Sequence, residues 1–123
     1  MKTSFAEIDK IFHFKGIWDI PSKCGLKILN KNDNYTIIVS ELYKDNPGTS
    51  VTQAVCSLAK QICNEFTIPQ DKITYIEHNP GMNSKLSFYD EEFFLVNFEY
   101  SNNNFVNPIY TEISGDDVKR YYK

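Results

Sequence analysis

The strongest constraint on the fold is one long amphipathic helix placed between two strand-like runs. Residues 51–66 repeat apolar side chains at i, i+3 and i+4, the pattern of a helix with one buried stripe. The run 35–42 precedes this helix and the run 72–78 follows it. The first run contains Ile37-Ile38-Val39, which is apolar on successive residues, as in a strand buried on both faces. This order predicts a β-α-β crossover with two parallel strands.

The remaining segments predict short strands and turns around this unit. A helix starting after Ser114 is expected to run through Tyr122, and Pro108 suits an edge strand. We predict an α+β fold, a two-layer sandwich in which a mixed, mostly antiparallel sheet carries the long helix and the short C-terminal helix on one face. No linker divides the 123 residues, so we expect a single domain over 1–123. The other expected strands are 11–14, 25–29, 91–100 and 105–113, with turns at 30–34 and 101–104.

Composition excludes several classes of partner and location. The formal net charge of -3 and the pI of about 5.3 disfavour nucleic acid and acidic lipid as partners. No apolar run is long enough to span a membrane, and the N-terminal residues lack a signal-peptide core. Cys56 and Cys63 would lie about 10 Å apart along the helix, too far for a disulfide. We therefore expect reduced thiols and a cytoplasmic protein. Richness in Asn, Lys, Ile and Tyr favours an AT-rich bacterial or phage genome.

The segment before the long helix is the first part of a candidate site. Asn46-Pro47-Gly48 has the residue order of a type II turn, and Thr49 and Ser50 follow it as candidate helix caps. The N–H groups of a helix N-terminus attract anions, and the hydroxyl of Thr52 would lie close by. The same residues also make a well-formed turn and cap without any ligand, so both interpretations stay open.

The end of the following strand is the second part. If the two strands are parallel, Glu77, His78 and Asn79 emerge at the edge where the turn lies, and ligands of open α/β sheets bind at such edges. Adjacent strand residues point to opposite faces, so Glu77 and His78 should not contact one ligand together. Two distant histidines without a Cys-x-x-Cys motif predict no metal, and we expect no cofactor. The predicted ligand-binding residues are Asn46, Gly48, Thr49, Ser50, Thr52, Glu77 and Asn79.

Both segments resemble a group of small bacterial proteins. That group has Asn-Pro-Gly-Thr-Ser-Val-Thr-Asn before a helix and an aromatic-Ile-Glu-His-Tyr-Pro strand end. The matching segments here are 45–54 and 75–80, with Gln53 in place of Asn and Asn79 in place of Tyr. The group has no established activity, so the resemblance implies no function. It implies that the two strand ends form one site.

Three classes of function fit these observations. The first is a small soluble binding protein that holds a polar, anionic ligand, nucleotide-like or phosphorylated, at the turn 48–52. The second is a protein-interaction or homo-oligomerisation module that uses an aromatic sheet face, because the second half of the chain is rich in Phe and Tyr. The third is a hydrolase or transferase with Glu77 or His78 as general base. It ranks last because no nucleophile, metal set or cofactor motif accompanies it, so the sequence favours a non-enzyme.

Overall fold

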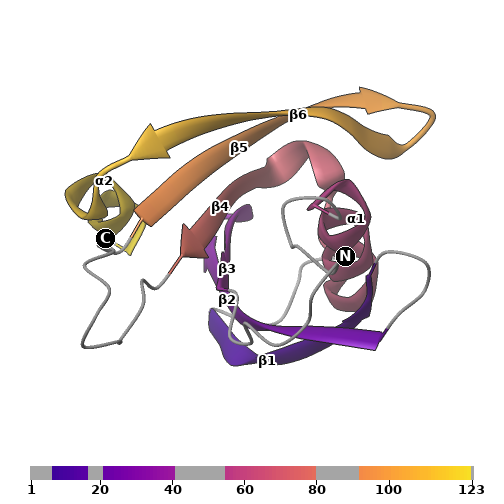
Figure 1. Cartoon of the computed structure of the whole chain (residues 1–123), viewed down its shortest axis with the longest axis horizontal. Coiled ribbons are helices and arrows are strands. Elements are labelled where there is room, and N and C mark those ends of the chain that lie inside the picture. The colour runs from indigo at the N-terminus through magenta and orange to yellow at the C-terminus, as the bar shows by residue number, and fades with distance from the viewer. Residues whose placement is uncertain (1–6, 17–20, 41–54, 80–91, 123) are drawn as a thin grey trace, which may run out of the picture.

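The computed structural model describes residues 7–16, 21–40, 55–79 and 92–122, and within these ranges the chain has the α+β fold predicted (Figure 1). Six strands form one mixed sheet, and a long and a short helix accompany it. The sheet order follows the chain order from β1 to β6. The strands are β1 (Glu7–Lys15), β2 (Pro21–Lys31), β3 (Asn34–Ser40), β4 (Ile73–Asn79), β5 (Glu92–Ser101) and β6 (Asn104–Ile113). The helices are α1 (Val55–Phe66) and α2 (Gly115–Lys119), with 3₁₀ turns at Gln70–Lys72 and Arg120–Tyr122.

The predicted crossover is confirmed. β3 and β4 are parallel neighbours, with Tyr35 opposite Ile73 at one end and Ser40 opposite His78 at the other. The other neighbouring pairs in the described sheet are antiparallel. The helix α1 lies in the connection between the two parallel strands. The carboxyl ends of β3 and β4 therefore meet at one edge of the sheet.

Two hairpins are closed by the turn residues that the sequence indicated. Asn32 and Asp33 join β2 to β3 with φ values of 54° and 65°. The turn between β5 and β6 repeats this geometry at Asn102 and Asn103, with φ values of 52° and 65°. Two successive residues with positive φ form the turn that matches the twist of a hairpin, and Asn and Asp tolerate that conformation. The side chain of Asn30 accepts a hydrogen bond of 3.0 Å from the N–H of Asp33 and so secures the first turn.

The main core lies between α1 and the sheet, which curves around the helix (Figure 1). The predicted stripe is buried along α1 from Val55 to Ile62, and its predicted residues before 55 lie outside the described ranges. The fully buried sheet residues Ile28, Ile37 and Val39 belong to the same cluster as this stripe. Phe105 brings the far half of the β5–β6 hairpin into this core. The buried stripe of α1 consists of Val55, Leu58, Ala59, Ile62 and Cys63.

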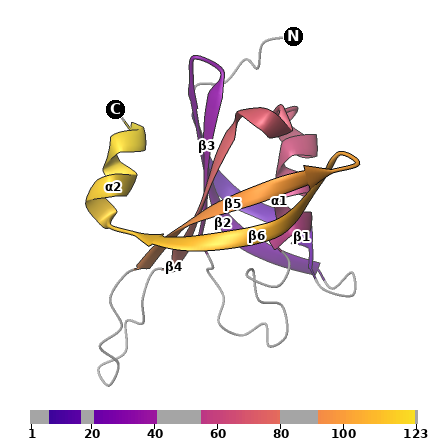
Figure 2. The same cartoon turned by 90° about the horizontal axis from the view of Figure 1, so that it is seen from above.

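The short helix α2 lies on the face of the sheet opposite α1 (Figure 2), whereas the sequence analysis placed both helices on one face. Val118 of α2 packs against Ile38 and Ile76, in a second cluster separate from the main core. Side chains alternate along a strand, so Ile38 points away from the face that Ile37 and Val39 share with α1. The run Ile37-Ile38-Val39 indicates burial on both faces but does not say which helix covers which face.

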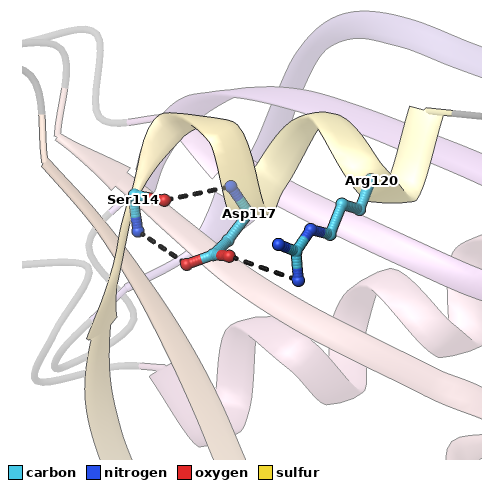
Figure 3. Close-up of polar contacts among 3 residues, drawn as sticks. All are labelled: Ser114, Asp117 and Arg120. Atoms are coloured by element: carbon cyan, nitrogen blue, oxygen red, sulfur yellow. Dashed lines mark hydrogen bonds and ion pairs between the residues drawn. The ribbon is translucent and has the colours of Figure 1, made fainter.

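A capping box starts α2 where the sequence predicted a helix start (Figure 3). The N–H of Asp117 donates to the Ser114 hydroxyl at 3.1 Å, and the N–H of Ser114 donates to the Asp117 carboxylate at 3.2 Å. Arg120 Nη1 lies 3.6 Å from the same carboxylate. The pKa of Asp117 is lowered, chiefly because its ionised form accepts the Ser114 N–H. The cap sets the start of α2 directly after β6, whose last residues pair with the start of β5.

Candidate functional site

One row of side chains crosses the sheet on the α2 face, near the ends of β3 and β4. Directly paired residues of neighbouring strands project to the same face, so the row can be followed through the strand register. It consists of Ile11, Gly25, Ser40, His78, Phe93 and Ile113, from β1 to β6. Gly25 has no side chain and that of Ser40 is small. No bulky side chain in this row therefore covers β2 and β3, and strand spacing makes the step from Ile11 to His78 about 14 Å.

A groove of about 1010 Å³ lies over this hollow, between α2 on one side and β1 on the other. We refer to it as the α2 groove. Its volume is at the upper end of the range of small-molecule sites, which is about 300–1,000 Å³. Its described lining is Asp9, Lys10, Ile11, Gly25, Leu26, Lys27, Ile38, Ser40, His78, Phe93, Ser114, Gly115, Asp116, Val118 and Lys119.

His78 is held in a fixed orientation at the groove. Its Nδ1 atom lies 2.7 Å from Ser40 Oγ, a hydrogen bond across the parallel strand pair. Its ring stacks on Phe93, with ring centroids 4.5 Å apart and an interplanar angle of 7°. The neighbouring strands on both sides of β4 therefore position the imidazole. A hydroxyl and an imidazole in hydrogen-bond contact provide a donor and an acceptor beside an apolar surface.

The described lining of the α2 groove carries charged side chains of both signs, three lysines and two aspartates. Asp9 and Lys27 face each other on the β1–β2 wall, and Asp116 and Lys119 belong to the α2 wall. Lys119 Nζ lies 3.8 Å from an oxygen of Asp116, and Lys27 pairs with the neighbouring carboxylate of Glu7 at 3.3 Å. The groove can thus offer both ammonium donors and carboxylate acceptors to a ligand.

Glu77 lies on the other face, which confirms that it does not share a ligand with His78. It is in register with Val39, whose side chain belongs to the α1 core. Burial raises the pKa of Tyr110 to about 12, and the negative charge of Glu77 is the next cause. The pKa of Tyr75 is raised for the same two reasons, in the same order. Glu77 therefore lies near these two tyrosines on the α1 face. The structure thus places Glu77 and His78, two residues of the predicted site, on opposite faces of the sheet.

Most of the predicted anion site lies outside the described residues. This applies to Asn46, Gly48, Thr49, Ser50 and Thr52. Asn79 ends β4 opposite Glu92, at the same edge of the sheet as Ser40. Ligand binding at the turn 48–52 stays a prediction.

The structure adds residues that sequence reasoning missed. Ser40 pairs with His78, Phe93 supports the imidazole, and Gly25 leaves the floor of the α2 groove open. Only Gly25 carried a signal in the sequence, because a glycine inside a strand often marks a place where another group approaches the backbone closely. Ser40 and Phe93 become recognisable only once the strand register is known.

In the part of the chain that the structure describes, no three or more His, Cys, Asp or Glu side chains gather as a metal site would require. No helix there is long and apolar enough to cross a membrane. Comparisons of the chain with protein-family models, with curated proteins and with solved structures find no match.

Proposed function

We propose that the chain is a binding protein that holds a small, nucleotide-like molecule in the α2 groove. The observation that carries the proposal is the hollow over Gly25 and Ser40 beside the Ser40–His78 hydrogen bond. This hollow lies near the carboxyl ends of the one parallel strand pair in the described sheet. Ligands of open α/β sheets often bind at the carboxyl ends of parallel strands.

The lining of the α2 groove suits a ligand with a flat apolar part and charged or hydroxylated ends. Ile11, Ile38 and Phe93 provide apolar surface from three different strands. Lys27 and Lys119 can donate to a phosphate, while the carboxylates among the lining residues can accept from amino or hydroxyl groups. Small-molecule sites combine an apolar surface with a few polar groups in this way. A nucleoside phosphate carries all three kinds of group.

Isothermal titration calorimetry with adenosine monophosphate and ribose 5-phosphate tests the proposal. We expect adenosine monophosphate to bind at one molecule per chain. Ribose 5-phosphate lacks the flat ring and should bind at least about tenfold more weakly, a loss of about 1.4 kcal/mol. Gly25→Phe should fill the hollow and weaken binding of adenosine monophosphate by at least about the same factor.

The matched control is Ile109→Phe, which adds the same ring to an exposed position of β6 that does not line the α2 groove. It should leave the affinity unchanged. Gly25 lies inside β2, where a side chain is conformationally favoured over glycine, so the variant should keep the circular dichroism spectrum of a folded chain. Equal affinities for Gly25→Phe and the unaltered chain, or no heat with either ligand, would contradict the proposal.

The Ser40–His78 hydrogen bond favours a second candidate function, ester hydrolysis. His78 Nδ1 would take the Ser40 proton as Oγ attacks the ester carbonyl, and the alcohol would leave with that proton. Water would then release the acid from the acyl-serine. We expect 4-nitrophenyl acetate turnover to fall at least about 100-fold in Ser40→Ala and in His78→Asn. Ser57→Ala, at an exposed position of α1, is the control. Equal rates in all four proteins would exclude this function.

A further inference from the structure

The strand β1 lies at one edge of the sheet formed by the described residues, and the backbone of this edge has a known orientation. The N–H of Lys15 donates to Gln61 Oε1 at 2.9 Å, and Gln61 Nε2 donates to the C=O of Lys15 at 2.9 Å. Both backbone groups of Lys15 therefore point toward α1 and away from β2. In an antiparallel pair, this orientation alternates along the strand. Asp9, Ile11 and His13 thus also direct their N–H and C=O groups outward.

The Gln61 carboxamide takes the place that a peptide group of another strand would take at Lys15. It has the same donor and acceptor, and it ends the accessible edge at that residue. Before it, from Asp9 to His13, the edge keeps the hydrogen-bonding geometry that a further strand requires. A groove of about 460 Å³ runs along this stretch, bordered by Gln61 and Asn64 of α1. Such an edge is a template for pairing with another chain.

The sequence of β1 is complementary to itself when read in the opposite direction. A two-fold axis at Ile11 places Ile11 opposite Ile11 of a second copy. The same pairing places the Asp9 carboxylate opposite the His13 imidazole, and it stops before Lys15, whose backbone groups are bonded to Gln61. An imidazole can donate a hydrogen bond to a carboxylate across the strand pair, whereas like charges directly opposite each other destabilise the pair. Moving the axis to Lys10 would instead place Lys10 opposite itself, so charge repulsion favours the register centred on Ile11 over the one centred on Lys10.

The exposure of Ile11 and the sequence of the opposite edge strand also favour β1 as the edge that pairs with a second copy of the chain. Ile11 is 46% exposed, which is high for a large apolar side chain, and self-pairing would cover it. The opposite edge strand, β6, contains Pro108, which has no N–H to donate. Of the two edges of the described sheet, β1 is therefore the better suited to accept a strand.

We propose that β1 pairs antiparallel with β1 of a second copy of this chain, centred on Ile11, so that the two sheets become continuous. Directly opposed residues share a face, so Ile11 and His13 of the second copy would lie beside Ile11 and Asp9. These two residues line the α2 groove, and the second copy would therefore extend its outer wall. The pairing does not depend on the ligand proposed above.

Sedimentation velocity on the full chain tests this pairing through two charge variants. The unaltered chain should be a dimer. Ile11→Lys and Ile11→Glu each place like charges opposite each other and should weaken the dimer at least about tenfold, or about 1.4 kcal/mol. Mixing the two variants should restore a dimer, because Lys then faces Glu. Ile109→Lys and Ile109→Glu, at a position 61% exposed on β6, should change nothing.

Three results would overturn the proposal. One is a monomeric unaltered chain at the highest concentration that stays soluble. Another is a dimer disrupted by the Ile109 variants but not by the Ile11 variants. The third is a mixture of Ile11→Lys and Ile11→Glu that stays monomeric. Because Ile11 is half exposed, the variants should remain folded, and circular dichroism verifies this for each protein.

Discussion

Replacing Ile62 with alanine is expected to lower the free energy of unfolding by about 2–5 kcal/mol. Ile62 is a fully buried member of the α1 stripe, within the cluster that joins α1 to the sheet. Truncating it removes apolar burial and leaves a cavity that the surrounding sheet can only partly close. Small domains are stable by about 5–15 kcal/mol, so the loss is a large fraction of the total. Urea denaturation followed by circular dichroism measures it.

The control for this prediction is Ile109→Ala, which makes the same chemical change where the side chain is 61% exposed. It should alter the free energy of unfolding by no more than about 0.5 kcal/mol. Similar losses in the two variants would mean that α1 does not pack on the sheet as described.

The chain is also expected to lose stability steeply in alkali. Burial raises the pKa of both Cys24 and Cys63 from 9.0 to about 12. In the unfolded chain these thiols ionise near their ordinary pKa, while in the folded chain they keep their protons to higher pH. Between these limits the folded state binds more protons, so the free energy of unfolding falls as pH rises. A pKa difference of this size is worth about 4 kcal/mol for each thiol once the pH exceeds both pKa values, and about 3 kcal/mol of it is lost by pH 11.

Measuring the free energy of unfolding at several pH values from 7 to 11 tests this expected loss of stability. The unaltered chain should be most stable below pH 9, and its loss above that value should exceed that of the double variant Cys24→Ala/Cys63→Ala. The variant should be less stable at neutral pH, because the removed sulfur atoms leave small cavities. Parallel pH profiles for the two proteins would show that the buried thiols do not cause the alkaline loss.

The central part of the fold could be predicted because the sequence patterns that indicate it lie within single short segments of the chain. The α1 stripe and the run Ile37-Ile38-Val39 have distinct periods, and together they specify a helix between two buried strands. The boundaries of β1 and β2 could not be predicted in the same way. Glu7 and Pro21 start these strands although neither favours one, because pairing with β2 and β1 respectively holds them in the sheet.

The candidate site was less predictable, because it depends on contacts between distant residues. The sequence indicated that β3 and β4 end at one edge, and the structure confirms this at Ser40 and His78. It did not indicate the α2 groove. That groove requires the registers of several strands, the missing side chain of Gly25, and the position of α2 on the second face of the sheet.

The claim that the α2 groove binds a ligand is tested most directly by amide chemical shifts. A ¹⁵N–¹H correlation spectrum recorded with increasing adenosine monophosphate should show the largest changes at Gly25, Ser40, His78 and Lys119, which lie on four separate elements around the groove. Changes confined to the α1 side, for example at Gln61 and Asn64, or an unchanged spectrum, would contradict the claim.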